Sequence, residues 1–307
     1  MKTERNWGWP IAGYLFLGGL GGGAIIVSSV ADLFLGRGDV FALGSFITAA
    51  LIAVGSGLLV FELGRPLQFW RVFSRQKAIM TVGAWMLSLL IVTGFLYFTF
   101  WPDFSPWRPA VGLRKALAVL NLVLGLGVCT YTGILLGSLN ARRFWNTPAL
   151  PVLFLVSGLS TGVALQSLLA GAWPYAGGHE AVEALHGSLR AVDLALIVME
   201  LVVLMVYVLM MRTTAGPAAA RAAARWLNGA YAKWFWGGVI AAGLLLPLVL
   251  YALGVPVLPS LCVLAGGLIL RFLVVYSDDR TFLPGEEKYL ARLPRGDEAF
   301  LRAGTQQ

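Results

Sequence analysis

The stretch WPIAGYLFLGGLGGGAIIVSSVADLFL, from Trp9 to Leu35, decides the fold. An apolar run of this length can cross a bilayer as a helix. Its middle, Gly18 to Gly23, has almost no side chains. Such glycines would weaken a helix in water, but in lipid they let neighbouring helix backbones pack closely. The sequence therefore predicts a membrane-spanning helix around which the other helices gather.

The composition of the whole protein indicates an integral membrane protein. Of the 307 residues, 58% are hydrophobic and only 12% are charged, which is not the composition of a soluble domain. The first apolar run is too long for a signal peptide and lacks a small-residue cleavage site, so we expect it to be retained as the first helix. The net charge of +8 comes from basic residues between apolar runs, which favours membrane topology over nucleic-acid binding as its cause.

Eight apolar runs are long enough to span a membrane, so the predicted fold is an all-α membrane protein with eight transmembrane helices. The runs cover residues 10–35, 40–63, 78–100, 114–139, 149–172, 188–211, 234–253 and 256–277. Between the sixth and seventh runs, Ala218 to Trp226 is expected to form a short helix on the membrane surface.

An even number of spans places both termini on one side of the membrane, here called face A, and the opposite side is face B. Twelve Lys and Arg residues lie in segments on face A, five more lie in the tail after Asp278, and only five lie on face B. The positive-inside rule therefore predicts cytoplasmic termini, in a bacterial or archaeal cytoplasmic membrane. A docking surface for a partner could produce the same bias.

The two halves of the sequence show a weak internal repeat. Gly19-Leu20-Gly21-Gly22-Gly23 matches Gly158-Leu159-Ser160-Thr161-Gly162 at an offset of 139, and Glu62 matches Glu200 at an offset of 138. Two four-helix halves that start on the same face would be parallel repeats. Duplication and chance both remain open at this point.

Cysteine and histidine usage limits the redox groups that the protein could hold. Cys129 and Cys262 lie within apolar runs, and the two histidines, His179 and His186, lie in one loop. Neither a cysteine-ligated iron–sulfur cluster nor a haem held between facing helices is expected. A solvated loop helix explains the histidines and their neighbouring glutamates better than a metal site does.

Three polar side chains are predicted to meet near face A. Tyr14 and Tyr131 lie a few turns inside the first and fourth spans, and Glu62 closes the second span, three residues before Arg65. Tyrosine hydroxyls could donate hydrogen bonds to a quinone headgroup, and a carboxylate at the interface could exchange its protons with water. The alternative is that the tyrosines are interfacial belt residues and that Glu62 and Arg65 merely end a helix.

A second polar set lies deeper in the membrane. Asp193 and Glu200 belong to the sixth span and Arg271 to the eighth. By depth Glu200 and Arg271 could pair, which would stabilise both charges in the bilayer. Asp193 and Glu200 could also form a proton path, and the sequence leaves both readings open.

Four motifs in order resemble the NrfD/PsrC family, the membrane subunits of polysulfide-reductase-type complexes. The first is Trp7-x-Trp9 leading into Tyr14-Leu-Phe-Leu-Gly-Gly-Leu-Gly-Gly-Gly, and the second is Glu62-Leu-Gly-Arg-Pro-Leu-x-Phe-Trp. The others are Gly83-Ala-Trp85, and Tyr131-Thr-Gly-Ile-Leu-Leu followed by Asn140, Arg143 and Trp145. The layout is similar over all eight spans, and the motifs are specific in the first four.

This resemblance implies two four-helix bundles, which we place at residues 1–147 and 148–277, followed by a polar tail at 278–307. It implies a quinone site in the first bundle, for menaquinone or ubiquinone. Tyr131 matches the family's quinone-binding tyrosine, Tyr14 falls where some members have a histidine, and Glu62 stands where aspartate is common.

The resemblance also implies partner subunits: a ferredoxin-like iron–sulfur subunit with four clusters and a molybdopterin-type catalytic subunit, or in some relatives a cytochrome or hydrogenase. The candidate docking residues on face A are Arg71, Arg75, Arg142 and Arg143. In much of the family the docking face is periplasmic, whereas the basic residues here favour the cytoplasm.

The function expected from the sequence is that of a quinone-binding membrane anchor, which exchanges electrons between a partner's clusters and the quinone pool in anaerobic respiration. One alternative is a secondary transporter or proton-translocating protein that uses Asp193, Glu200 and Arg271. A purely structural anchor is the third possibility.

Overall fold

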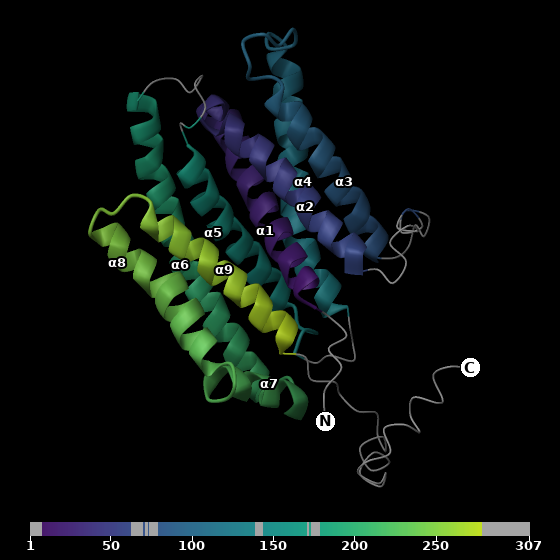
Figure 1. Cartoon of the computed structure of the whole chain (residues 1–307), viewed down its shortest axis with the longest axis vertical. Helices are drawn as coiled ribbons and strands as arrows, with labels where there is room; N and C mark the ends of the chain where they lie inside the picture. The colour runs from purple at the N-terminus through teal and green to yellow at the C-terminus, as the bar shows by residue number, and fades with distance from the viewer. Residues whose placement is uncertain are drawn as a thin grey trace.

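The computed structural model describes residues 8–62, 70, 73, 79–138, 144–170, 172 and 179–277, and all regular structure in them is helical. In sequence order the elements are α1 (Trp9–Val30) with its π-helical extension η1 (Ala31–Leu35), η2 (Gly38–Phe41), α2 (Ala42–Glu62), α3 (Ile79–Phe98), α4 (Val111–Gly137), α5 (Ala149–Leu169), α6 (His179–Thr213), α7 (Pro217–Leu227), η4 (Lys233–Leu245) running into α8 (Leu246–Ala252), and α9 (Leu258–Tyr276). Figure 1 shows the long helices packed side by side.

Within these residues, eight helical segments are long and apolar enough to cross a membrane, which confirms the predicted fold class. All eight begin and end within about three residues of the predicted limits. The helix that contains the sixth span, α6, extends further and begins at His179. His179 and His186 therefore belong to the first turns of a long helix, not to a separate loop helix as predicted. The helix over Ala218 to Trp226 is present as α7, and its alanine face and Trp226 are buried.

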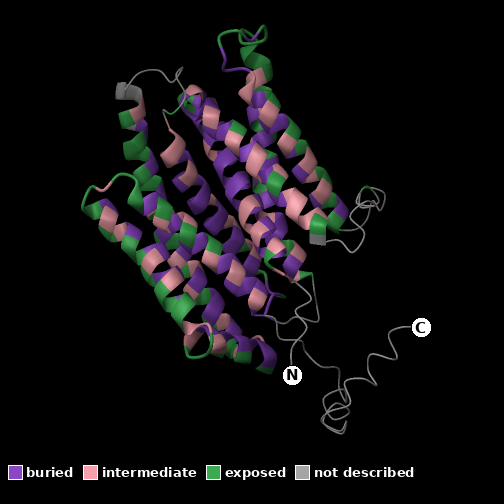
Figure 2. Cartoon of the chain, viewed as in Figure 1, coloured by how far each residue is buried: buried purple, intermediate pink, exposed green. Residues whose placement is uncertain are grey.

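Helix α1 lies at the centre of the molecule, as the opening glycine-rich stretch predicts. It packs against α2, α4, α5 and α9. In its most apolar part 78% of the residues are buried, against 33% in the outer helix α3. Figure 2 shows the same contrast between the mostly buried α1 and the outer helices.

The glycines of α1 let it approach α5 to within backbone contact. A Cβ atom added at Gly23 would overlap the backbone oxygen of Gly158, and one added at Gly162 would overlap the backbone of Gly23. A Cβ at Gly158 would lie 3.0 Å from the backbone oxygen of Gly19. The two Gly-x-x-x-Gly segments that match in the sequence repeat therefore pack directly against each other, the arrangement by which small residues join membrane helices.

The helices of each half contact one another in the same order. In the first half α1 packs on α2 and α4, and α3 packs on α2 and α4. In the second half α5 packs on α6 and α9, and η4 packs on α6 and α9. Because α1, α4, α5 and α9 also pack together across the middle, the division into two bundles at residue 147 stays a prediction.

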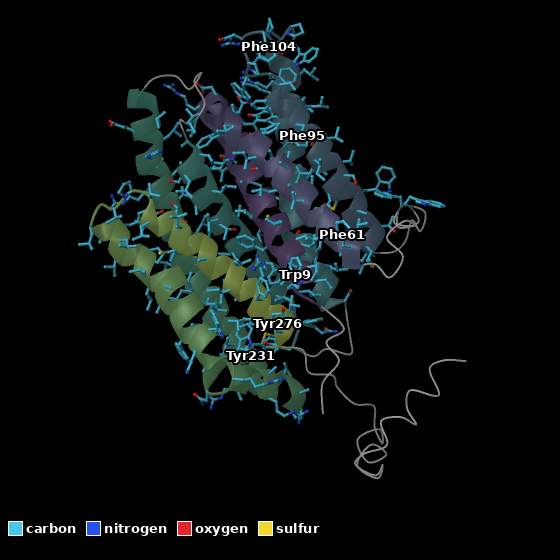
Figure 3. The ribbon with its side chains drawn as sticks, viewed as in Figure 1. Trp9, Phe61, Phe95, Phe104, Tyr231 and Tyr276 are labelled. Carbon is cyan, nitrogen blue, oxygen red and sulfur yellow. The ribbon has the colours of Figure 1, made fainter. Side chains whose placement is uncertain are left out.

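The ends of the helices fall on two opposite faces. Trp9 and Phe61 lie toward the same end of the molecule as Tyr231 and Tyr276, whereas Phe104 lies at the opposite end (Figure 3). The first four mark face A, and Phe104 marks face B. The predicted polar tail, 278–307, lies outside the described residues.

Candidate functional site

The hydroxyl-bearing ring of Tyr131 is held in a gap that a glycine provides. Tyr131 lies on α4, six residues before the helix ends at Gly137, and is 6% exposed. Gly83 on α3 faces it so closely that an added Cβ would overlap the ring and its hydroxyl oxygen. No larger residue could occupy position 83 without displacing the phenol, so Gly83 fixes where the Tyr131 hydroxyl lies.

Tyr14 lies beside Tyr131. It is 1% exposed, five residues into α1 from Trp9, and its phenol interacts with that of Tyr131. The Tyr14 hydroxyl makes no hydrogen bond of normal geometry in the described residues. At about 1.5 Å per residue, both side chains lie roughly 8 Å inside the face A ends of their helices. The structure thus brings together the two tyrosines that the sequence predicted to meet.

An apolar cleft opens beside Tyr131, between α2 and α3. Its empty space, counted out to the opening, is about 650 Å³. Most of its wall is aliphatic, and the only hydroxyl groups among the described lining residues are those of two serines and Tyr131. The lining residues are Ser56, Leu59, Val60, Phe73, Met80, Ala84, Leu87, Ser88, Ile91 and Tyr131.

The other residues predicted for this site are only partly covered by the structure. Glu62 is the last residue of α2, one turn beyond Leu59 and therefore near the face A end of the cleft. The side chain of Glu62 lies outside the described part of the structure, as do Arg65 and the predicted docking residues Arg71, Arg75, Arg142 and Arg143.

Asp193 lies in the second half, in a polar contact between three helices. Its Oδ2 accepts a hydrogen bond of 2.5 Å from the Tyr251 hydroxyl of α8. Ser160 of α5 faces both Asp193 and Glu200, which lie two turns apart on α6. Both carboxyl groups thus lie near one serine side chain, whose hydroxyl makes no hydrogen bond of normal geometry in the described residues, and both are at least 97% buried.

Arg271 lies near Glu200 but does not form the predicted ion pair. The two charges interact, yet no salt bridge joins them in the described structure. Instead Nη2 of Arg271 donates to the backbone oxygen of Phe154 at 3.2 Å, and the guanidinium lies 3.9 Å from the centre of the Phe154 ring. Gly19 leaves room for it, since an added Cβ would lie 3.2 Å from Nη2. Arg271 and Glu200 lie close together, as their depth in the sequence suggested, but they do not form a direct ion pair in the described structure.

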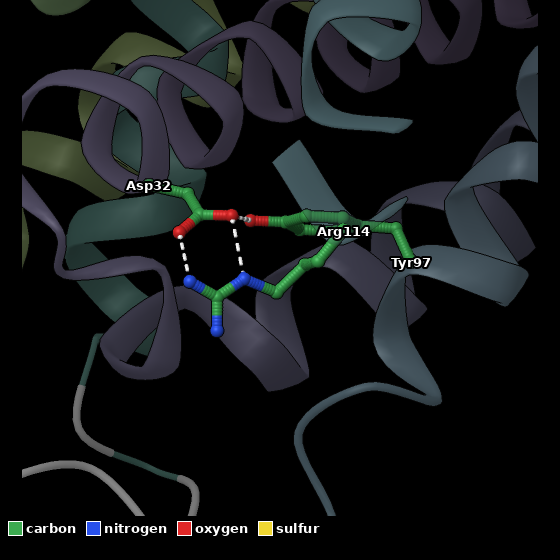
Figure 4. Close-up of polar contacts among 3 residues, drawn as sticks. All are labelled: Asp32, Tyr97 and Arg114. Atoms are coloured by element: carbon green, nitrogen blue, oxygen red, sulfur yellow. Dashed lines mark hydrogen bonds and ion pairs between the residues drawn. The ribbon is translucent and has the colours of Figure 1, made fainter. Parts of the chain in front are cut away.

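Sequence reasoning missed a polar cluster near face B. Asp32, in the π-helical turn η1, is fully buried and is held by Arg114 through two contacts, at 2.9 Å to Oδ1 and 3.1 Å to Oδ2 (Figure 4). Tyr97 donates a hydrogen bond of 3.0 Å to Oδ2, and Trp101 lies 4.5 Å from the Arg114 guanidinium. A carboxylate inside the first apolar run was the available signal. This cluster joins α1 to α3 and α4 at the end opposite the tyrosines.

Metal ligands do not cluster anywhere in the described residues: no three His, Cys, Asp or Glu side chains lie together. Glu183 and His186 are both exposed on α6. The chemistry that the Tyr131 cleft offers is hydrogen bonding to the oxygen of an apolar ligand that enters from the lipid. The Tyr131 phenol supplies a donor in the cleft wall, and the aliphatic side chains suit a hydrocarbon ring and tail.

Comparison with known proteins identifies the family. A sequence model of the NrfD family, described as polysulphide reductase, NrfD, matches residues 1–281. One component of the polysulfide reductase of Wolinella succinogenes is 33% identical over 299 residues, covering 88% of this protein and 93% of that one. Protein NrfD of Escherichia coli is 30% identical over 306 residues, covering 90% and 95%.

A more distant relative, one of the subunits of the selenate reductase of Mesobacillus selenatarsenatis, is 22% identical over 212 residues, covering 55% of this protein and 49% of that one. The names of the polysulfide and selenate reductase relatives describe parts of reductases. Together with the eight candidate membrane spans, these matches show that the chain belongs to the NrfD family, the polysulfide-reductase-type membrane subunits of oxidoreductase complexes.

Proposed function

We propose that this protein binds quinone or quinol in the cleft between α2 and α3 and exchanges electrons between the membrane quinone pool and a partner iron–sulfur subunit. The observation that carries the proposal is a largely aliphatic cleft with the Tyr131 hydroxyl in its wall and Tyr14 behind it. A quinone needs this combination, because its ring and tail are apolar while its oxygens require hydrogen-bond donors.

In this proposal Tyr131 donates a hydrogen bond to one headgroup oxygen, and Tyr14 supports the Tyr131 phenol from inside the bundle. Gly83 fixes the position of the ring. Glu62, at the face A end of α2, exchanges protons with water, and Arg65, three residues later, stabilises the charged form of the Glu62 carboxyl group. These two roles are proposed from sequence position.

The location of the tyrosines near face A supports direct electron exchange with a partner that docks there. Both phenols lie roughly 8 Å inside that face, and the protein's two histidines belong to one short segment, so they cannot hold a haem between facing helices. We assign docking to Arg71, Arg75, Arg142 and Arg143, with a four-cluster ferredoxin-like subunit in contact and a molybdopterin-type catalytic subunit beyond it. The positive-inside rule assigns face A to the cytoplasm.

The test is Tyr131→Phe in the purified complex, because this change removes one hydroxyl and keeps the ring. Quinol turnover should fall, while the set of copurifying subunits and the unfolding temperature stay those of the wild type. Tyr207→Phe is the matched control, since the Tyr207 hydroxyl bonds the backbone oxygen of Phe144 outside the cleft. Unchanged quinone kinetics in Tyr131→Phe would refute the proposal.

A second candidate function, proton movement through the second half, is favoured by the Ser160 side chain that faces both Asp193 and Glu200. In this proposal Asp193, Glu200 and Arg271 form a proton path that operates together with quinone chemistry. A transporter that works without an oxidoreductase would lack the redox partners that this proposal requires.

Glu200→Gln in complexes reconstituted into liposomes tests the path. Quinone turnover should continue, whereas the number of protons moved per electron should fall, as measured with a pH-sensitive dye trapped inside. Glu183→Gln, an exposed position on the same helix, is the control. An unchanged proton-to-electron ratio in Glu200→Gln would exclude the path.

A further inference from the structure

One hydroxyl group in the cleft wall has no hydrogen-bond partner in the described residues. Serine and threonine side chains within membrane helices commonly donate to a backbone oxygen one turn earlier. Ser45, Ser56 and Thr93 do so here, with donor to acceptor distances of 2.8 to 3.0 Å. Ser88 on α3 does not: its hydroxyl makes no hydrogen bond in the described part of the protein, and the residue is half-buried in the cleft wall.

Ser88 lies on the stripe of α3 that faces the cleft. Ala84, Leu87, Ser88 and Ile91 all line it, at the spacing of one helical face. Gly83, which touches the Tyr131 ring, lies five residues before Ser88, or about 7.5 Å along the helix axis. The free hydroxyl is therefore displaced from the Tyr131 hydroxyl toward the middle of the membrane.

Ser56 contributes a second hydroxyl from the α2 wall of the same cleft. Its hydrogen is used, because Oγ donates to the backbone oxygen of Ile52 at 2.9 Å. Its lone pairs remain available to accept a hydrogen bond. Besides Tyr131, the described lining of the cleft therefore has two hydroxyl groups, that of Ser56 on α2 and that of Ser88 on α3.

We infer that Ser88 and Ser56 bind the second oxygen of the quinone headgroup, the one across the ring from the oxygen at Tyr131. This inference rests on the proposed quinone function. In the oxidised ligand Ser88 donates to the carbonyl oxygen. In the reduced ligand the quinol hydroxyl donates to Ser56 or Ser88, whose oxygens can both accept. The pair therefore suits both redox states without moving a proton itself, and it orients the ring with its inner oxygen away from face A.

The experiment compares Ser88→Ala, Ser56→Ala and Tyr131→Phe in the purified complex, with a dimethylnaphthoquinol as substrate. Ser138→Ala is the matched control, since Ser138 is exposed and lies outside the cleft. Ser88→Ala should raise the KM about two- to tenfold, the effect of losing one hydrogen bond, with a smaller change in kcat. Ser88→Thr, which restores a hydroxyl, should recover most of the loss.

Infrared difference spectra of bound, carbon-13-labelled naphthoquinone give a readout that a structural role would not affect. In the wild type both carbonyl bands should be shifted by hydrogen bonding. Ser88→Ala should return one band toward its free frequency, and Tyr131→Phe should return the other. If Ser88→Ala leaves both the KM and the two bands unchanged while Tyr131→Phe impairs turnover, the inference is wrong and the proposed function stands. If neither variant changes turnover or spectra, both are wrong.

Discussion

Replacing Gly83 by alanine tests the contact that positions Tyr131. The added methyl would overlap the phenol ring and hydroxyl, so either the ring or helix α3 must shift. Overpacking of this kind costs about 1 to 3 kcal/mol of stability. If Tyr131 binds quinone as proposed, a displaced hydroxyl also loses that hydrogen bond, which is worth about 0.5 to 1.5 kcal/mol, or roughly two- to tenfold in affinity.

The assay is a double-mutant cycle on protein in mixed micelles, unfolded by increasing SDS. Gly83→Ala is measured in the wild type and in Tyr131→Ala, where the ring is absent and the methyl has space. The coupling energy should be about 1 to 3 kcal/mol, since the two residues touch. Gly57→Ala is the control, because a Cβ at that position meets nothing within 4 Å.

The reasoning would be refuted if Gly83→Ala cost the same free energy of unfolding with and without the Tyr131 ring. Tyr131 would then not be the neighbour that requires glycine at position 83. Quinone affinity offers an independent check. It should be lower in Gly83→Ala than in the wild type even when the two proteins are compared at SDS concentrations that give them the same unfolding free energy.

Three further predictions concern other parts of the molecule. Gly23→Ala should separate α1 from α5 and lower the SDS concentration at half-unfolding, because its Cβ would overlap the backbone of α5. An SDS concentration at half-unfolding equal to that of the wild type would contradict the close contact of the two helices. Arg114→Leu should cost about 3 to 5 kcal/mol of unfolding free energy by leaving the buried Asp32 carboxylate without its cation, and adding Asp32→Asn should recover part of it; no recovery would contradict the pairing. Ser160→Ala should lower the proton-to-electron ratio in liposomes without altering the KM for quinone. A changed KM with a normal ratio would show that Ser160 serves quinone binding and not the proton path.

The eight spans could be predicted because each is a long apolar run, and apolar length is what a bilayer requires. The same signal fails where a helix continues into water. The first turns of α6, from His179, are helical but polar, so hydropathy placed the start of the sixth span near residue 188. Hydropathy therefore identifies the membrane segment and not the ends of the helix.

Depth within a span predicted which side chains could meet but not which of them do. Tyr14 and Tyr131 share a depth and lie together, whereas Glu200 and Arg271 share a depth and form no salt bridge in the described structure. The difference is the rotation of each helix about its axis, which depends on packing. The pairing of Asp32 with Arg114 joins residues 82 positions apart, and it required the same packing information.

The roles suggested for Gly83 and Ser88 also depend on packing. Gly83 belongs to a motif that the sequence shares with the NrfD family, yet only its contact with the Tyr131 ring explains why a side chain is excluded there. Ser88 resembles many other serines in membrane helices, and only its place in the wall of the Tyr131 cleft, with a hydroxyl that makes no hydrogen bond in the described residues, distinguishes it.

The glycine crossing between α1 and α5 has a consequence for biosynthesis. A polypeptide made from its N-terminus inserts α1 before α5, the helix that covers Gly19 and Gly23. Until α5 enters the membrane these two glycines lack their packing partner, because α2 and α4 contact other sides of α1. A ribosome that stalls before residue 149 therefore leaves this face of α1 uncovered.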